Sequence, residues 1–313
     1  MPENTNDRKT AKKKFLTRVI SGVVILVITV ALGIVGGPVL GAALCIIACI
    51  GYVEFTNATK VREEGHRFNA LQGIGLATII AYYAALLIQD DMYCPEALKA
   101  WFSKTVGSFN VFTVLILLIF IVGFIGILYV YIFTFPKFKF QQISNAVFGI
   151  LYLGLTLSFI YYIRELPGGI FLVWMPFISA WFSDTCAYLV GVTLGKHKMT
   201  PRLSPKKTYE GAAGGILGAT LGSIILGIVY TVVHKAGAIS ILSFACMGFV
   251  GSMASMCGDL AASAIKRNND VKDFGKIIPG HGGIIDRFDS VIFTAPMVYF
   301  LMSLLLQFAE EVK

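Results

Sequence analysis

Charged residues are scarce in this chain. Of its 313 residues, 14% are Asp, Glu, Lys or Arg and 56% are hydrophobic, whereas soluble domains contain about 25% charged residues. This composition excludes an ordinary soluble protein. Apolar runs of 18 or more residues recur between positions 19 and 308, and each is long enough to cross a hydrocarbon core of about 30 Å as a helix. We therefore predict an integral membrane protein.

Segments of alternating polarity, the mark of an outer-membrane barrel, are absent from the sequence. Helices must therefore span the membrane, because they pair their own backbone polar groups within lipid. We predict an all-α, polytopic fold with about nine transmembrane helices. Their predicted ranges are 19–35, 37–55, 70–88, 110–134, 144–163, 170–193, 212–233, 239–257 and 289–308.

Closely spaced cysteine pairs are also missing. The chain has six cysteines and no Cys-x-x-Cys pair, and five of the six lie in or at the ends of predicted spans. Cysteine in such a span behaves as a small hydrophobic residue. We therefore expect neither a zinc site nor a disulfide framework.

The net charge is +8, with 26 Lys and Arg residues. In the nine-span arrangement 21 of these 26 fall on the side of the N-terminus, which matches the positive-inside rule. Topology thus explains the charge, and we expect no nucleic-acid partner. We predict a multi-pass protein of the cell membrane with a cytoplasmic N-terminus and an external C-terminus. The first span exceeds the roughly 7–15 apolar residues of a signal peptide and lacks a convincing Ala-x-Ala site, so we expect it to be retained.

The chain divides into three regions. Residues 1–18 form a basic, cytoplasmic N-terminus, and residues 19–163 form a membrane region without a chemically specific motif. In residues 164–313 polar residues enter the spans, and the intervening loops are rich in Gly, Lys and Asp. We place the catalytic loops in this third region. Glycines at 211–227 have the small-xxx-small spacing that favours close helix packing.

Asp184 is the first candidate site residue, within "SAWFSDTCAYLVGVTLGKHK" at 179–198. It lies about ten residues inside the cytoplasmic end of its predicted span, hence roughly 15 Å deep. A carboxylate at that depth is costly and usually lines a cavity or pairs with a cation. A buried structural ion pair and a protonated, hydrogen-bonded Asp remain alternatives.

The second candidate is the loop "RLSPKKTYEG" at 202–211. Lys206 and Lys207, with the hydroxyl groups of Ser204 and Thr208, have the chemistry to bind phosphate oxygens. Basic loops next to cytoplasmic span ends are also common for topological reasons alone. This loop is therefore a weak signal by itself.

The third candidate is the 258–290 stretch, where carboxylates flank a polar loop. Asp259 is predicted to end one span, and Asp286 and Asp289 are predicted to open the next. Because Asp286 and Asp289 are three residues apart, their carboxylates lie on one face of the helix. Hard oxygen ligands of this kind suit Mg²⁺, which also binds substrate phosphates. Alternatively, Asp289 only caps its helix.

The loop between these carboxylates carries positive charge and glycines. Its basic residues are Lys266, Arg267, Lys272 and Lys276, and its turn contains Gly280, Gly282 and Gly283. Glycines let backbone amides approach an anion, although they also serve simply to turn the chain. His281 is expected to orient a neighbour by hydrogen bonding, since no second His lies near it in the sequence. Carboxylates and cations together favour a site for metal-bound polyphosphate.

These stretches together resemble the phosphatidate cytidylyltransferases, membrane nucleotidyltransferases also called CDP-diacylglycerol synthases. The long signature matches "SAIKRNNDVKDFGKIIPGHGGIIDRFD", and a second block matches from Asp184 to "SPKKTYEG" at 204–211. The resemblance is sharp over positions 180–290. The chain before position 170 matches only as a hydrophobic multi-span region.

The resemblance implies a helical homodimer with about nine spans, which transfers CMP from CTP to phosphatidate in phospholipid synthesis and releases pyrophosphate. It implies Mg²⁺ on Asp259 and Asp286, with Asp289 as an additional candidate ligand. The family is also associated with K⁺, for which no motif here indicates a site. The catalytic residues that the resemblance implies are Asp259, Asp286, Lys207 and Asp184. The implied substrate contacts are Ser204, Lys206, Lys266, Arg267, Gly280, His281, Gly282, Gly283 and Arg287.

Two other functions fit part of the sequence. A CDP-alcohol phosphotransferase uses similar substrates, but its Asp-Gly-x-x-Ala-Arg pattern is absent. A polytopic ion or lipid transporter would explain the spans and the Asp within a span. It would not explain a loop rich in Gly, His, Asp and Arg outside the hydrocarbon.

Overall fold

The computed structural model describes residues 5–62, 68–89, 94–234 and 239–311. In this part of the chain nine helices are long and apolar enough to cross a membrane, so the predicted all-α, multi-pass fold is confirmed. Their candidate spans are Leu16–Val35, Gly37–Ala58, Ala70–Gln89, Val111–Phe133, Phe140–Glu165, Gly169–Thr193, Tyr209–His234, Ile241–Asn268 and Ile285–Leu305.

The elements follow one another in a simple order. The spans that consist of one continuous helix are α1 (Thr5–Val35), α2 (Gly37–Ala58), α3 (Ala70–Gln89), α5 (Val111–Phe133), α10 (Tyr209–His234), α11 (Ile239–Asn268) and α12 (Ile285–Glu311). One span combines α6 (Phe140–Gly149), the π-helix η1 (Ile150–Leu155) and α7 (Thr156–Glu165), and another combines α8 (Gly169–Leu172) and α9 (Met175–Thr193). The short elements are α4 (Glu96–Phe102), β1 (Thr105–Val106), β2 (Phe109–Asn110), β3 (Lys198–Thr200) and β4 (Ser204–Thr208).

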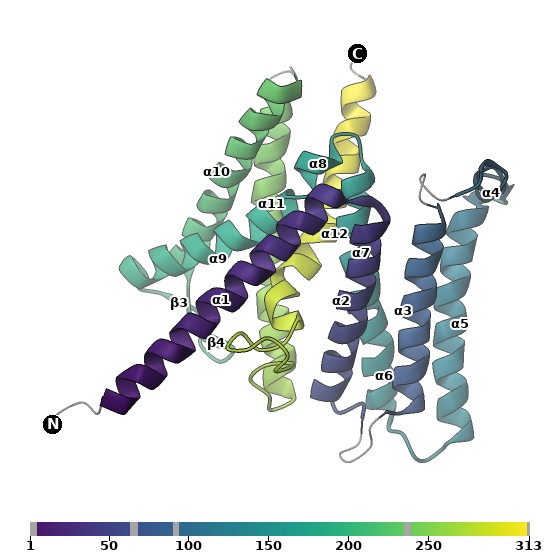
Figure 1. The fold of residues 1–313 in the computed structure, drawn as a ribbon, viewed down its shortest axis with the longest axis horizontal. Coiled ribbons are helices and arrows are strands. Elements are labelled where there is room, and N and C mark those ends of the chain that lie inside the picture. Colours follow the sequence, from purple (N-terminus) through teal and green to yellow (C-terminus); the bar gives the residue numbers. More distant parts are fainter. Residues whose placement is uncertain (1–4, 63–67, 90–93, 235–238, 312–313) are drawn as a thin grey trace.

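The helices form two packed groups (Figure 1). Helices α2, α3, α5 and α6 pack together on one side, and α9, α10, α11 and α12, the C-terminal group, pack on the other. Helix α7 joins the groups through contacts with α2 and α12. The N-terminus and the β3–β4 hairpin lie toward one end of the molecule, and the C-terminus lies at the other (Figure 1).

Small residues bring α9 and α10 together. A Cβ atom added at Gly214 would lie 2.5 Å from Val190 Cγ2, and one at Gly218 would overlap Cys186. Glycine therefore removes the side chains that would keep these helices apart. The predicted close packing of residues 211–227 is confirmed.

Helix α1 crosses the C-terminal group obliquely (Figure 1) and is held at its C-terminal end and near its middle. Toward its C-terminal end, Arg164 Nε and Nη2 donate hydrogen bonds to the carbonyl oxygens of Gly33 and Ile34, at 2.9 and 3.1 Å. Near its middle, Ser21 Oγ lies 2.7 Å from His281 Nδ1. These contacts fix α1 beside the loop that precedes α12.

Two of the predicted boundaries that bear on the candidate site were wrong. Helix α11 continues to Asn268, so Asp259 does not end it; residues such as Ala261, Ala262 and Ala264 sustain the helix beyond the apolar segment. Helix α12 begins at Ile285, so Asp289 lies more than one turn inside it and is not its cap. The hairpin of β3 and β4 was also not predicted, because its strands are short and polar.

Candidate active site

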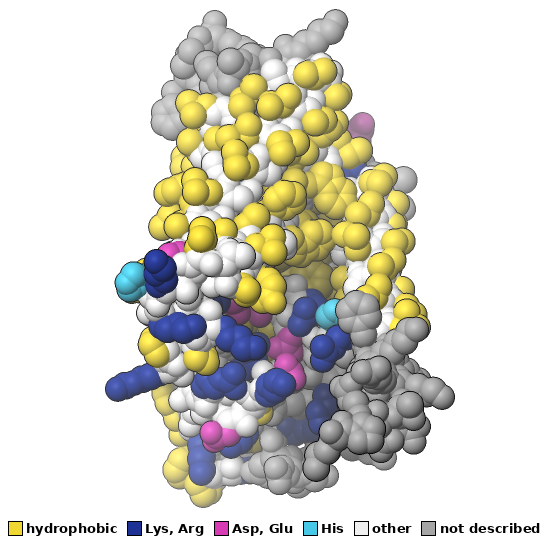
Figure 2. Space-filling view, turned by 90° about the vertical axis from the view of Figure 1, so that its left-hand side faces the viewer, with side chains coloured by type: hydrophobic (Ala, Val, Ile, Leu, Met, Phe, Trp, Pro, Cys, Tyr) yellow, Lys and Arg dark blue, Asp and Glu magenta, His cyan; other side chains and the backbone are white. Residues whose placement is uncertain are grey.

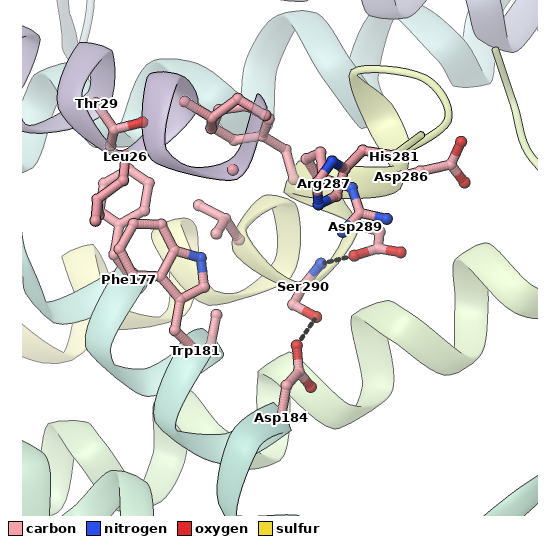
Figure 3. A pocket seen from close by; sticks show the side chains of 15 residues that line it. Leu26, Thr29, Phe177, Trp181, Asp184, His281, Asp286, Arg287, Asp289 and Ser290 are labelled. Atoms are coloured by element: carbon pink, nitrogen blue, oxygen red, sulfur yellow. Dashed lines mark hydrogen bonds between the residues drawn. The ribbon is translucent and has the colours of Figure 1, made fainter. Parts of the chain in front are cut away.

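The three predicted stretches come together at one end of the C-terminal group. Helix α9 contributes Asp184, the β3–β4 hairpin contributes Lys207, and α11 contributes Asp259 and Lys266. The loop 269–284 and the first turns of α12 complete the site (Figure 3). Basic side chains gather on this part of the surface around a recess with acidic side chains, below an apolar surface (Figure 2).

The β3–β4 hairpin directs Lys207 toward α11. Strand β4 pairs antiparallel with β3, with Lys198 opposite Thr208, and successive side chains of a strand point to opposite faces. Lys207 Nζ lies 2.5 Å from Asp259 Oδ2. Thr208 is buried and its Oγ1 accepts a hydrogen bond from Gly211 N at 3.1 Å, which fixes the start of α10. Lys206 is exposed.

Glu210 secures the base of this hairpin. Its carboxylate accepts hydrogen bonds from the backbone N–H groups of Lys196 and His197 and lies 2.6 Å from His197 Nδ1. Ser204, at the other end of β4, pairs with Thr200 and is half-buried. The sequence motif contained Glu210 but did not indicate this role.

Asp286 organises the loop before α12. Its Oδ2 accepts hydrogen bonds from Phe274 N at 2.9 Å and Gly283 N at 3.0 Å, and its Oδ1 accepts one from Lys266 Nζ at 2.9 Å. Lys266 also lies over the Phe274 ring, 5.4 Å from its centroid. Asp286 is 8% exposed. One carboxylate thus joins α11, the loop and α12.

Asp289 and Asp184 meet at Ser290 (Figure 3). Ser290 N donates to Asp289 Oδ1 at 2.8 Å, and Ser290 Oγ donates to Asp184 Oδ2 at 3.5 Å. Both carboxylates lie within electrostatic range of Asp259. With Asp286, four carboxylates from α9, α11 and α12 therefore surround the site, facing Lys207, Lys266 and Arg287.

His281 connects the loop to α1. Ser21 Oγ lies 2.7 Å from His281 Nδ1 and 3.2 Å from the Pro279 carbonyl oxygen. Partial burial, together with the charges of Arg287 and Arg18, lowers the pKa of His281 from its ordinary value. The neutral ring that these surroundings favour is suited to orienting neighbours by hydrogen bonding. No pattern in the sequence indicated Ser21 as the partner.

The three glycines of the turn differ in their surroundings. Gly280 and Gly282 have φ angles of 77° and 88°, which side chains rarely tolerate. Gly283 is buried and donates its N–H to Asp286. A Cβ atom at Gly283 would lie 2.5 Å from Glu54 Oε2. Space for Glu54 is therefore a reason for glycine at this position.

Two cavities meet at His281 and Arg287. The first has a volume of about 330 Å³ and is lined on one side by apolar residues of α1 and α9, including Leu26, Phe177 and Trp181, and on the other by charged residues (Figure 3). The second, of about 590 Å³, is predominantly basic. Its charged residues are Arg18, Lys272, Asp273, Lys276 and Arg287.

Two predicted contacts lie at the edge of this arrangement. The side chains of Lys206 and Arg267 are exposed, on β4 and near the end of α11. Within the described ranges, no three His, Cys, Asp or Glu side chains are arranged to hold a metal ion by themselves. A divalent ion here would need oxygen atoms from water or a substrate in addition.

Glu54 was not among the predicted site residues. This residue on α2 is 4% exposed, and its Oε2 accepts a hydrogen bond from Ile285 N at 3.3 Å. The signal was present, because Glu54 is the single Asp or Glu within the five spans predicted for residues 19–163. Its target at the start of α12 could not be read from the sequence.

The sequence of this site matches known proteins. A model of the Cytidylyltransferase family matches residues 16–305. The chain belongs to the cytidylyltransferase family. It is 39% identical over 168 residues to a phosphatidate cytidylyltransferase of Bacillus subtilis, and 36% identical over 166 residues to those of Staphylococcus epidermidis and Staphylococcus aureus. Each alignment covers 53% of this chain and 61% of the relative.

The chain thus spans about three fifths of the length of these cytidylyltransferases. The family assignment agrees with the resemblance found in the two motif blocks. In the described part of the chain, nine apolar helices carry a basic cavity and a cluster of carboxylates.

Proposed function

We propose that this cytidylyltransferase transfers CMP from CTP to phosphatidate, producing CDP-diacylglycerol and pyrophosphate. The observation that carries this proposal is the pair of cavities that share His281 and Arg287. One is half apolar and lies against α1, and the other is basic. A reaction between an amphipathic phosphate and a soluble polyphosphate needs these two environments side by side.

The first cavity suits the lipid substrate. Its apolar wall of α1 and α9 residues would contact the glycerol backbone and the start of the acyl chains, and Arg287 would bind the lipid phosphate. Gly22, Ile25 and Leu26 line this cavity from α1. Helix α1 would therefore form one side of the lipid site.

Filling this cavity is expected to affect the lipid substrate selectively. A Cβ atom at Gly22 would lie 3.8 Å from His281 Cε1, so Gly22→Leu places a branched side chain in the cavity. We expect KM for phosphatidate to rise about tenfold, equivalent to about 1.4 kcal/mol if KM follows binding, with KM for CTP nearly unchanged. Val23→Leu is the control, because Val23 is exposed on the next position of α1. Equal kinetics for both variants would contradict this assignment.

The second cavity suits the triphosphate of CTP. Arg18, Lys272, Lys276 and Arg287 would neutralise its phosphate oxygens by charge-assisted hydrogen bonds. Lys207 and Lys266 lie at the carboxylate cluster and would bind phosphate oxygens once substrate enters. Lys206, Ser204 and Arg267 would contribute from the edge.

The reaction is an in-line displacement. A phosphate oxygen of phosphatidate bonds to the α-phosphorus of CTP while the bond from that phosphorus to the bridging oxygen breaks, and pyrophosphate leaves with the electron pair. The second pKa of a phosphomonoester is about 6, so the nucleophile is already mostly dianionic near pH 7. The residues of the chain therefore need to position two anions and screen their charge rather than remove a proton.

The donor chemistry of the site fits a magnesium ion. Four carboxylates face three cationic side chains in the cluster, which leaves negative charge for a cation to balance. Asp259 and Asp286 would hold the ion, with Asp289 beside them; Lys207 and Lys266 would exchange their carboxylate contacts for phosphate contacts. When bound, Mg²⁺ supplies charge neutralisation at the phosphates.

The predicted orientation has a direct test. With a cytoplasmic N-terminus, the β3–β4 hairpin and the end of α11 also face the cytoplasm. Lys198→Cys and Asn268→Cys, each in a background with the six native cysteines replaced by Ala, are expected to react with a membrane-impermeant maleimide only from the cytoplasmic side of sealed vesicles. Both positions are exposed. Labelling of either one only from outside would contradict the orientation.

The proposed activity is tested with purified protein, Mg²⁺ and CTP labelled in the cytosine ring. Label is expected in the organic-solvent extract when phosphatidate is supplied, and not when diacylglycerol replaces it, because the lipid phosphate is the nucleophile. A lipid transporter would leave all label in the aqueous phase. Chemical cross-linking in the same detergent tests the predicted homodimer.

A further inference from the structure

Helix α12 begins without a capping side chain of its own. The residues before it are Gly282, Gly283 and Ile284, and none has a polar side chain. The first N–H groups of a helix need acceptors. Glu54, on α2, supplies one: its carboxylate accepts hydrogen bonds from Ile285 N, at 3.3 Å, and from Ile284 N. A side chain from another helix thus caps α12.

The loop before α12 is shaped around this carboxylate. A Cβ atom at Gly283 would lie 2.5 and 2.6 Å from the two carboxylate oxygens of Glu54, and one at Gly275 would overlap Oε1. The next residue of α2, Phe55, stacks with Phe274 at a centroid distance of 6.2 Å. Two consecutive residues of α2 therefore support the loop.

These contacts lead directly to Asp286. Phe274 contacts Phe55, and Gly283 lies against Glu54. The backbone N–H groups of these two loop residues donate the hydrogen bonds that hold Asp286 Oδ2. Asp286 is also the second residue of α12, whose first N–H is bound by Glu54. The position of the Asp286 carboxylate consequently depends on Glu54 through both the loop and the helix.

Packing alone does not explain a buried carboxylate at position 54, because its burial costs free energy. The residue is 4% exposed, and in the described part of the chain its Oε1 has no hydrogen-bond partner. A buried carboxylate with an unsatisfied oxygen is destabilising. An apolar side chain would fill this space at lower cost, but it would leave the N–H groups of Ile284 and Ile285 without this acceptor.

We propose that Glu54 is a positioning residue, which holds the start of α12 so that Asp286 is oriented for the metal and phosphates of the reaction. This role rests on the proposed cytidylyl transfer. It also gives the membrane region of residues 19–163 a part in the active site, because α2 belongs to that region and lies far from α12 in the sequence.

Three variants test this role. Glu54→Ala removes the acceptor, Glu54→Gln retains one oxygen that can accept from Ile285 N, and Gln72→Ala is the matched control. Gln72 is similarly buried and hydrogen-bonds to Thr56 and Asn57 at the same end of α2. It lies on α3 and makes none of these loop contacts.

Two measurements are made on each full-length protein. The first is steady-state kinetics, which gives kcat and the Mg²⁺ concentration required for half-maximal rate. The second is hydrogen–deuterium exchange of amides 273–290 without substrate. For Glu54→Ala we expect kcat to fall by about tenfold or more, the Mg²⁺ requirement to rise several-fold, and exchange to accelerate. Glu54→Gln should recover most of these losses, and Gln72→Ala should show none of them.

Other outcomes would overturn the proposal. Faster exchange in Glu54→Ala with wild-type kcat and Mg²⁺ requirement would mean that Glu54 caps α12 without affecting the reaction. Unchanged exchange would refute the capping contact. If Glu54→Ala does not fold, Glu54→Asp replaces it, since its shorter side chain keeps the charge but draws back from Ile285 N. A wild-type protein without activity would instead refute the proposed function, while exchange would still test the contact.

Discussion

Replacing Asp259 by Asn is expected to lower kcat by about 10²–10³-fold, because a few kcal/mol of charge stabilisation corresponds to this loss. Asn has nearly the same size and keeps a hydrogen-bonding group, but it cannot attract a cation. Asp259 faces Lys207 at the centre of the carboxylate cluster and is partly exposed. The variant should therefore fold and remain helical in detergent.

Asp286→Asn is expected to lose at least as much activity, with an added structural effect. The Asp286 carboxylate accepts hydrogen bonds from Lys266, Phe274 and Gly283, and an amide group cannot accept all of them. Loosening of the loop should accompany the loss of charge. Asp289→Asn should also lower kcat, since Asp289 lies within α12 beside Ser290 and near Asp259 rather than capping the helix.

The control for these variants is Asp270→Asn. Asp270 is exposed just after α11 and has a φ angle of 58°, which Asn also tolerates. Its activity should equal that of the wild type. EDTA should stop the wild-type reaction, and added Mg²⁺ should restore it. If Asp259→Asn and Asp286→Asn both retain near-wild-type rates and metal dependence, the metal assignment is wrong.

Lys207→Ala is expected to lower kcat/KM for CTP by about 10²-fold, the usual cost of removing one group that stabilises developing negative charge. Lys207 extends from β4 to Asp259, so its ammonium group lies where phosphate oxygens would approach the carboxylate cluster. The loss should appear in steady-state rates at varied CTP, while the melting temperature remains close to that of the wild type.

Neighbouring lysines separate this effect from a general loss of positive charge. Lys206 points away from α11 because strand side chains alternate, so Lys206→Ala should have a smaller effect than Lys207→Ala. Lys198, exposed on β3, serves as the control, and Lys198→Ala should leave the rate unchanged. Similar rates for all three variants would indicate that the hairpin is basic for topological reasons only.

Hydropathy was sufficient to predict the nine spans found in the described part of the chain, because lipid requires long apolar segments whatever their packing. It could not predict where the helices end. Helix α11 extends beyond its apolar segment to Asn268, and this extension carries Lys266 to Asp286. Backbone hydrogen bonding and helix propensity, rather than hydropathy, decide that boundary.

The motif blocks identified most of the charged residues that the structure brings together, including Asp184, Lys207, Asp259 and Asp286. They did not identify the contacts from outside the blocks. Ser21 binds His281, and Glu54 caps α12, from helices that lie far from the signature in the sequence. Such contacts depend on how the helices pack, which no local pattern encodes.

In the proposed reaction, the α-phosphorus of CTP is transferred to a lipid phosphate. The most direct test supplies the purified protein with phosphatidate and Mg²⁺, and with CTP labelled with ³²P at either the α- or the γ-phosphorus. We predict that the α-label appears in an organic-extractable lipid and the γ-label in pyrophosphate, both at the same rate. A γ-label in the lipid, or no phosphatidate-dependent transfer of the α-label, would contradict the proposed reaction.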